Sequence, residues 1–297
     1  TPWIKDMLAS GRESFYEAKD GSLTYYDVLS SSIKTKAPSK KSINLNLHKT
    51  GNNVVKKDWS ASLIDLGDGV LNVQFHSVLQ PTLNPIDGSI GQTISDGMDL
   101  LDANKYKALV IGHQGPNFCA GANLANMIQA IEAGAFDQMT NTIKQLQELT
   151  QRIRFSKAPV VAAPHHLTLG GGFELVAPAA HRVAAGELYI GAVEVGVGLI
   201  PGAGGNLRLI LNLMENSGKG RMNAFQVAQK AFETIGFAKV ATSAEEAKFM
   251  GYILKSDTVV LNNDQRIWVA KQKALELVND GYEPPQYRDD LKLPGTG

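Results

Sequence analysis

The sequence predicts an α/β protein in which short buried strands alternate with amphipathic helices. Apolar runs of strand length stand at 108–112 and 159–163, and helical apolar spacing fills 89–104 and 136–154 around them. Glycine-rich segments occupy two of the junctions where a strand would pass into a helix. This alternation is typical of βαβ architecture, and the glycine-rich junctions are where we expect a ligand.

A β-hairpin is the first element predicted for the core. Residues 62–66 and 70–76 are apolar-rich segments separated by Gly67-Asp68-Gly69, and an Asp-Gly turn between such segments is a strong hairpin signal. We therefore expect the core domain to begin at Ala61.

Residues 1–60 differ in composition from the rest of the chain. Residues 30–41 are rich in Ser, Lys and Pro with little apolar periodicity, which predicts a linker. Upstream of it stand apolar residues at helical spacing and several aromatic residues: Trp3, Ile4, Met7, Leu8, Phe15, Tyr16, Tyr25 and Tyr26. A short segment does not bury so many large side chains alone, so residues 1–60 are interpreted as the trailing segment of an upstream domain plus a linker.

The C-terminal part is predicted to be helical. Ser243 and Glu246 have the spacing of a capping box, which predicts a helix that ends at Gly251. A further helix is expected over 264–280. The predicted organisation is 1–60, a core at 61–263, and a C-terminal helix and tail at 264–297.

Composition narrows the class of partner. Lys plus Arg and Asp plus Glu both number 29, which argues against a nucleic-acid face. No apolar stretch reaches the length of a membrane span, and no signal-peptide pattern opens the chain. With Cys119 as the single cysteine, we expect a cytoplasmic protein whose partner is a small molecule or another protein.

The first glycine-rich segment is 117–123, with the sequence Asn-Phe-Cys-Ala-Gly-Ala-Asn. Its small residues allow a ligand to approach the backbone closely, so the amide of Ala120 is predicted to point into a cleft. The alternative is a tight strand-to-helix turn without a ligand.

The second segment is 169–174, Leu-Gly-Gly-Gly-Phe-Glu, which is predicted to open a helix running to about Ala179. Free amides at such a helix start suit an oxyanion or a phosphate. The glycine spacing matches neither a phosphate-binding P-loop nor a dinucleotide fingerprint. Close packing of the helix on the strand is the structural alternative.

Glu174 and Glu194 are two carboxylates in strongly apolar surroundings. Burial is expected to raise both pKa values, whereas a helix dipole would lower that of Glu174. Different environments of this kind allow one carboxylate to act as an acid and the other as a base. Each glutamate alone is more often a surface residue; the pair beside two amide-presenting loops predicts acid/base chemistry.

These segments resemble the crotonase (enoyl-CoA hydratase/isomerase) superfamily. Residues 117–124, 158–175 and 191–208 match its motifs in order and spacing, including the Gly-Gly-Gly-x-Glu turn and the Glu ahead of Ile-Pro-Gly-Ala-Gly-Gly. The resemblance implies a ββα spiral core with C-terminal helices. Residues 61–70, 193–201 and 281–285 look most like the hydratase part of bacterial fused 3-hydroxyacyl-CoA dehydrogenase/enoyl-CoA hydratases.

The resemblance also assigns roles. It places the oxyanion-hole amides at Ala120 and Gly171 and the catalytic glutamates at Glu174 and Glu194. It implies addition of water to a trans-2-enoyl-CoA in fatty-acid oxidation, with Glu174 as base, Glu194 as acid and coenzyme A as the carrier. The substrate-binding positions are expected at Ala120, Gly121, Ala122, Asn123, Leu124, Gly170, Gly172, Pro201 and Gly202.

The implied partners are an acyl-CoA thioester, an upstream dehydrogenase domain and further copies of the chain, since trimers are the family's habit. No cofactor is expected in this chain, and NAD would serve only the dehydrogenase. Two alternatives stay open. They are an isomerase that moves the double bond between positions 3 and 2, and a silent scaffold within the fused enzyme.

Three positions depart from the family pattern. Asn123 stands where Asp is common, Pro85 replaces a small Ala, and His165-His166 replaces an Asn-Gly or Phe-Gly pair. Adjacent side chains of an extended segment point oppositely, which argues against a metal site at the two histidines. Cys119 lacks a signature for a partner base and is interpreted as a packing residue.

Overall fold

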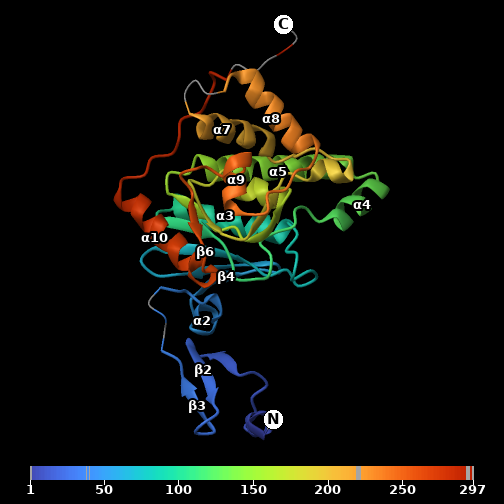
Figure 1. Cartoon of the computed structure of the whole chain (residues 1–297). Coiled ribbons are helices and arrows are strands. Elements are labelled where there is room, and N and C mark those ends of the chain that lie inside the picture. The colour runs from blue at the N-terminus through green and yellow to red at the C-terminus, as the bar shows by residue number, and fades with distance from the viewer. Residues whose placement is uncertain (1, 38, 40, 219–221, 292–294, 296–297) are drawn as a thin grey trace.

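The computed structural model describes residues 2–37, 39, 41–218, 222–291 and 295. Figure 1 shows a large α/β body, with a small N-terminal sheet projecting from one end and the C-terminus at the opposite end.

A seven-stranded sheet forms the centre of the body, in the order β12-β10-β8-β7-β6-β5-β4. Neighbours from β6 to β12 run parallel, whereas β4, β5 and β6 pair antiparallel. The strands are β4 (Val54–Lys57), β5 (Ala61–Asp65), β6 (Val70–Phe75), β7 (Ala108–Ile111), β8 (Val160–Ala162), β10 (His181–Ala185) and β12 (Thr258–Val260).

Helices bury both faces of this sheet. On one face Leu63 and Leu109 pack with residues of α3 (Gly88–Asp102) and α5 (Phe136–Arg154). On the other face, their neighbours Ile64 and Val110 pack with α2 (Leu45–Thr50) and α10 (Arg266–Asn279). Since successive strand residues point to opposite faces, burial on both sides explains why these strands are short continuous apolar runs.

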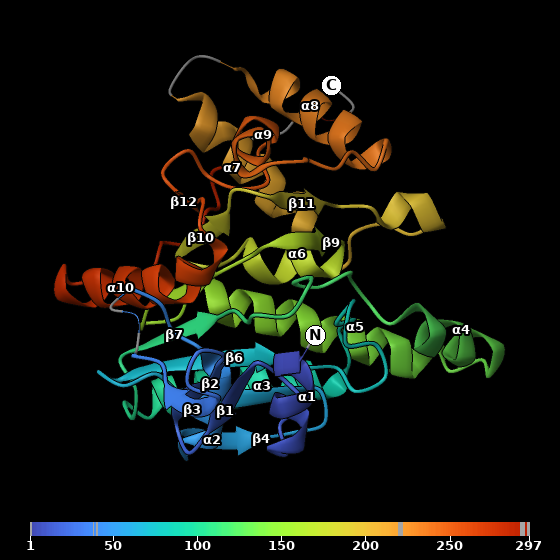
Figure 2. The same cartoon turned by 60° about the horizontal axis from the view of Figure 1, so that its bottom comes forward.

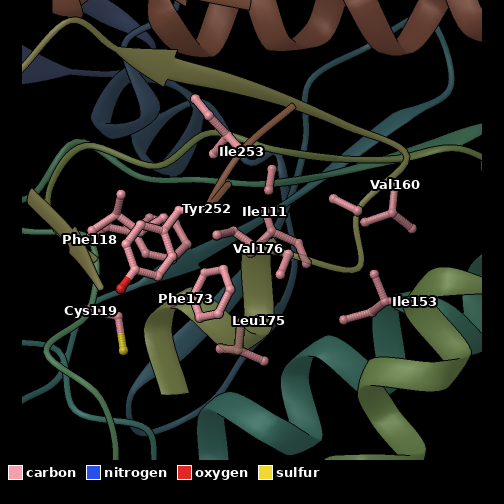
Figure 3. Close-up of a cluster of buried hydrophobic side chains, with 14 of the residues drawn as sticks. Ile111, Phe118, Cys119, Ile153, Val160, Phe173, Leu175, Val176, Tyr252 and Ile253 are labelled. Carbon is pink, nitrogen blue, oxygen red and sulfur yellow. The ribbon is translucent and has the colours of Figure 1, made fainter. Parts of the chain in front are cut away.

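A second, two-stranded parallel sheet leads the chain out of the main one. It consists of β9 (His166–Leu169) and β11 (Leu188–Gly191), and Figure 2 shows it stacked beyond the main sheet, beside α6. All residues of α6 (Gly171–Val176) are buried. Phe173, Leu175 and Val176 project from α6 into the core (Figure 3), where the Phe173 ring meets Tyr252 edge-on at 5.0 Å between centroids.

The remaining elements surround the body. Helices α7 and α8 lie toward the end of the molecule opposite the N-terminal sheet, and α4 projects to one side (Figures 1 and 2). They are α4 (Leu124–Glu132), the 3-10 turn η1 (Glu194–Val197), α7 (Gly205–Ser217), α8 (Ala224–Gly236), α9 (Ala244–Met250) and the 3-10 turn η2 (Asn263–Gln265).

Most predicted elements are confirmed. The hairpin forms as β5 and β6, with Gly67, Asp68 and Gly69 all at positive φ between them. The Ser243 side chain caps α9, and Gly251 ends it in the left-handed conformation. The Glu246 carboxylate, however, accepts from Thr242 N–H at 2.7 Å, one residue before the position that a capping box requires. The predicted helix through about Ala179 is shorter, because α6 ends at Val176.

The predicted linker is wrong for the strand β3 (Ser32–Thr35). This strand pairs with β2 (Ser22–Asp27), which pairs with β1 (Tyr16–Lys19), in a three-stranded antiparallel sheet after the helix α1 (Pro2–Ala9). Every residue of β3 is exposed, so backbone pairing forms the strand without the apolar alternation by which a sequence reveals one. Positions 38 and 40 of the predicted linker lie outside the described residues, as do 292–294, 296 and 297 of the predicted tail.

The core sheet also begins earlier than Ala61, because β4 pairs with β5. The polypeptide before it is anchored as well. The Gln114 side chain accepts from Leu45 N–H at 2.8 Å and donates to Ile43 C=O at 2.9 Å. In the N-terminal sheet the aromatic residues pack on one another, with Phe15 at 6.1 Å from Trp3 and 5.0 Å from Tyr16 between ring centroids.

Within the described ranges, no helix combines the length and the apolar character that crossing a membrane requires.

Arg266 joins α10 to the sheet and provides a test of this docking. Its fully buried guanidinium donates to Ala163 C=O and, at 2.7 Å, to His113 C=O. Arg266→Met leaves both buried carbonyls without this donor, so we expect the free energy of unfolding to fall by about 2–4 kcal/mol. Urea unfolding measures it, with Gln272→Met, an exposed position of α10, as the matched control expected within about 0.5 kcal/mol of wild type. An equal effect of the two changes would contradict the anchoring role of Arg266.

Candidate active site

The two glycine-rich segments lie side by side. Residues 118–119 run parallel to β9: Cys119 N–H donates to Leu167 C=O, and Leu169 N–H donates to Cys119 C=O, each at 2.9 Å. Gly170 N–H continues to Gly191 C=O at 2.8 Å. The second sheet therefore places the turn 170–172 between the segment 117–123 and the end of β11, just before Glu194.

The two segments approach this closely because glycine has no side chain. A Cβ on Gly172 would stand 2.6 Å from Cys119 C=O, and one on Gly121 would stand 3.2 Å from Leu169 C=O. Gly121 and Gly170 also have positive φ, 97° and 53°, a region that favours glycine. Backbone meets backbone here, so close packing, the structural alternative to a ligand, accounts for Gly172 and Gly121.

The amides of these segments are not equally free. Gly171 N–H, in the first turn of α6, has no hydrogen-bond acceptor among the residues described, and neither has Ala122 N–H. Ala120 N–H donates to Leu83 C=O at 2.8 Å. The structure thus differs from the prediction at Ala120, because the segment 83–86 runs alongside and occupies that amide. Within the described ranges Gly171 N–H is left without an acceptor, which is the condition that its assignment as an oxyanion donor requires.

Glu174 is held by backbone amides at one oxygen. Its Oε1 accepts from Ala203 N–H and Gly205 N–H, both at 2.8 Å, and its side chain is 4% exposed. Burial raises the pKa of Glu174 above the usual glutamate value, and the amides of Gly205 and Ala203 oppose that rise. Its Oε2 makes no hydrogen bond to a described residue, so one oxygen is anchored while the other is available for chemistry.

Glu194 has the opposite environment. Both of its oxygens are buried without a hydrogen-bond partner among the described residues. Burial raises the pKa of Glu194 to about 7, and the nearby charge of Glu174 adds to the rise. Its Oε1 lies 3.1 Å from the position of a Cβ on Gly170, so the carboxylate closes over the glycine turn. The two glutamates therefore face one site with different proton affinities.

The other predicted site residues surround this centre. Asn123 caps α4, its Oδ1 accepting from Asn126 N–H at 3.3 Å, and Leu124 is 43% exposed. Pro201 is buried, and Gly202 C=O accepts from the Gln147 amide at 2.7 Å. Of these four, Gly202 is the one that also affects a catalytic candidate, since its backbone helps to lower the pKa of Glu174.

Two buried histidines, His113 and His165, hold the segment 113–120 through hydrogen bonds to its backbone. Gly115 N–H donates to His113 Nδ1 at 3.1 Å, so the proton of the neutral His113 ring is on Nε2. This Nε2–H donates to Phe118 C=O at 2.8 Å. His165 Nε2–H donates to Gly115 C=O at 2.7 Å. Burial lowers the pKa of His113 to about 3, and both rings are needed in the neutral form. His166, the other half of the pair, is half-buried with Nδ1 at 3.5 Å from Glu187, so the two histidines serve different neighbours.

Sequence reasoning missed the supports of Glu174. One support consists of the amides of Ala203 and Gly205. The other is the Thr150 hydroxyl of α5, which donates to Ala203 C=O at 2.8 Å and so fixes the turn that carries these amides. A Cβ on Gly205 would stand 3.0 Å from Glu174 Oε1. The glycines of 202–205 were the available signal, since close approach to a carboxylate requires them.

This arrangement provides a free amide donor, an anchored carboxylate and a second carboxylate with raised proton affinity. Amides aimed at one point stabilise negative charge that develops on a carbonyl oxygen. The two carboxylates supply proton transfer on either side. The fold and site thus suit an enzyme class that transfers protons beside a carbonyl oxygen on which negative charge develops.

Comparison with known proteins agrees with this class. The sequence profile described as enoyl-CoA hydratase/isomerase matches residues 80–245. The chain belongs to the enoyl-CoA hydratase/isomerase family, within the crotonase superfamily.

The chain spans only part of the length of the relatives that it matches. It is 43% identical over 293 residues, 99% of its length, to a Bacillus subtilis protein named "Probable 3-hydroxyacyl-CoA dehydrogenase", of which it spans 36%. It is 30% identical over 201 residues to the mitochondrial methylglutaconyl-CoA hydratase of Rattus norvegicus, covering 66% of this chain and 56% of the relative.

The solved structures confirm the fold. An enoyl-CoA hydratase from Polaromonas sp. JS666 superposes with a TM-score of 0.61 at 23% identity, over 73% of this chain and 77% of that one. The predicted crotonase-like architecture is confirmed.

The neutral histidines make the site sensitive to acid. Because the folded pKa of His113 is about 3, against about 6.5 when unfolded, the unfolded state binds the proton first. The contribution of neutral His113 to the free energy of unfolding is therefore fully present above about pH 6.5. It is lost progressively as the pH drops toward 3. Each such histidine contributes a slope of up to about 1.4 kcal/mol per pH unit. Urea unfolding between pH 4 and 8 measures the free energy of unfolding of wild type and of His113→Gln. When each value is expressed relative to that at pH 8, the decrease toward low pH should be smaller in His113→Gln than in wild type. Parallel curves would refute the neutral role of His113.

Proposed function

We propose that the chain is an enoyl-CoA hydratase that adds water across the 2,3 double bond of a trans-2-enoyl thioester. The observation that carries the proposal is the carboxylate pair. Glu174 is anchored by two amides through one oxygen, and Glu194 is buried without a partner beside the free amide of Gly171. Hydration requires both a base for water and an acid for C2.

In the proposed reaction, Oε2 of Glu174 takes a proton from water as the water oxygen bonds to C3. The electron pair of the double bond moves onto the thioester oxygen, and the resulting enolate collects a proton at C2 from Glu194. The raised pKa of Glu194, about 7, keeps a large protonated fraction near neutral pH. The proton that Glu174 gained returns Glu194 to its acid form through solvent.

The enolate oxygen needs two amide donors. Gly171 N–H provides the first, a contribution of about 3 kcal/mol to the transition state in sites of this kind. The second comes from the segment 120–122. Ala122 N–H has no acceptor among the described residues, whereas Ala120 N–H must leave Leu83 C=O before it binds a substrate.

The surroundings of the pair suit a thioester with an apolar acyl chain. After Glu194 the chain exposes Val197, Leu199 and Ile200, at 57%, 38% and 76%. These exposed apolar side chains beside a polar centre fit an acyl group better than a charged substrate. Coenzyme A is the proposed carrier, and the residues 120–124 are the proposed contact for it.

We further propose that the chain acts as the hydratase part of a fused fatty-acid oxidation enzyme. The similarity to the B. subtilis relative covers almost all of this chain but about a third of that protein, which is named for dehydrogenase activity. NAD chemistry would belong to that other part. The N-terminal sheet, with its cluster of Trp3, Phe15 and Tyr16, is the proposed junction.

Replacement of either glutamate tests the proposal. Glu174→Gln and Glu194→Gln are each expected to lower kcat for crotonyl-CoA hydration by at least about 100-fold, followed as loss of enoyl absorbance. The wild-type rate should fall as the pH rises above about 7, because Glu194 loses its proton. Glu187→Gln, an exposed carboxylate outside the site, is the control. Unchanged hydration in either variant would refute its assigned role.

Product analysis separates hydration from double-bond migration. With a 3-enoyl thioester, an isomerase yields the 2-enoyl thioester without a hydroxyl, whereas a hydratase yields a 3-hydroxyacyl thioester from the 2-enoyl isomer. We expect the second result, because both glutamates are in place.

A scaffold without activity is the second candidate, and one observation favours it. The Ala120 amide is occupied by Leu83, and a Cβ on Gly171 would stand 2.8 Å from Ile86 Cδ1, so the segment 83–86 closes over the donors. A calorimetric titration with acetoacetyl-CoA decides between the hydratase and the scaffold. We expect a hydratase to bind this thioester and a scaffold not to bind it.

A further inference from the structure

A second polar pocket lies away from the glutamates, between α5, the first half of α7 and the C-terminal tail. It is a small cavity of about 70 Å³ lined on different sides by Arg154 of α5, Arg208 of α7, and Gln286 and Tyr287 of the tail. The tail reaches this position from α10 (Figure 1), and the Tyr287 ring packs 6.0 Å from that of Phe155.

The pocket holds two cations that make no close ion pair in the described ranges, and Glu215 attracts Arg154 only at longer range. Arg208 is 8% exposed and, like the half-buried Arg154, makes no hydrogen bond or ion pair with any residue in the described ranges. The neighbouring arginines are matched: Arg182 Nε lies 2.7 Å from Asp257 Oδ2, and Arg288 pairs with Asp290. Arg208 is therefore the less compensated of the two, since no carboxylate in the described part of the chain offsets the charges of Arg154 and Arg182 beside it.

Such an arrangement is unfavourable without a ligand. Burial lowers the pKa of Arg208 to about 10, and the charges of Arg154 and Arg182 add to the decrease. Buried charges are normally paired, because desolvation without compensation costs several kcal/mol. An anion inside the cavity would compensate Arg208 and Arg154 together, because both line it.

We propose that this pocket binds a phosphate group, free or carried by a small metabolite. Arg154 and Arg208 line the cavity from different helices, and guanidinium groups are well suited to bind a tetrahedral oxyanion. The Gln151 and Gln286 amides and the Tyr287 hydroxyl, on the same walls, supply further donors. One water molecule needs a cavity of roughly 10–15 Å³. The cavity of about 70 Å³ therefore has room for a phosphate group of five heavy atoms.

The test is a titration of the whole chain with inorganic phosphate at constant ionic strength set by chloride, followed by Tm and by ³¹P line width. Wild type should show a saturable rise in Tm with parallel line broadening. Arg208→Gln and Arg154→Gln should bind phosphate at least about tenfold more weakly. Lys144→Gln, an exposed cation on α5, should bind as wild type does. Glycerol 3-phosphate, titrated alongside, shows whether a carried phosphate enters as well as a free one.

A structural role for the arginines predicts a different result. In phosphate-free buffer, Arg154→Gln should be at least as stable as wild type, because it removes one of two repelling charges. The proposal is overturned if wild type shows no saturable response, if all variants respond alike, or if acetate replaces phosphate at equal concentration. Arg154 is half-buried, so its variant keeps the test valid should Arg208→Gln fail to fold. None of these readouts depends on hydratase activity.

Discussion

The site depends on one backbone contact, between the segment 117–122 and the junction of β9 with α6. Gly172 and Gly121 approach carbonyls of the opposite segment so closely that a methyl group would not fit at Gly172. The contact lies where α6 begins, at Gly171 with its N–H unpaired among the described residues, and Glu174 follows one turn later. A larger residue at Gly172 would separate the segments and move the amide and the carboxylate together.

Charge burial is the second constraint, and it connects stability with function. Glu174 is compensated by amides of the turn 203–205, which Thr150 supports. Glu194 has no such compensation, so the folded state binds its proton more tightly than the unfolded state does. Its contribution is therefore unfavourable as the pH rises from the unfolded value through about 7. Groups kept in this condition are more often functional than structural.

The sequence was sufficient to predict the main elements, because periodicity and turn chemistry are local. The hairpin at Gly67–Gly69, α5 and the capping of α9 all follow from a few adjacent residues. The two glutamates and the glycine turns also stand out locally. Strand β3 and the early start of the core at β4 were not predictable in this way, since exposed strands form through pairing with distant residues.

The same limit applied within the site. The partner of Ala120 is Leu83, and the clamp on Glu174 comes from residues 29 and 31 positions away. Spacing along the chain does not reveal such contacts, whereas the glycines at 202–205 indicated that something approaches the backbone there. Likewise, Arg154 and Arg208 are unremarkable in the sequence and become a pair only when α5 and α7 pack together.

The proposed function requires two buried carboxylates with raised pKa values, Glu174 and Glu194. Carboxyl ¹³C NMR of the chain labelled at glutamate, titrated from pH 4 to 9, measures it most directly. We expect a resonance that titrates near pH 7 and is lost in Glu194→Gln, together with a second, raised titration that is lost in Glu174→Gln. If every glutamate resonance titrated at the ordinary value of about 4.3, the proposed acid/base pair would be contradicted.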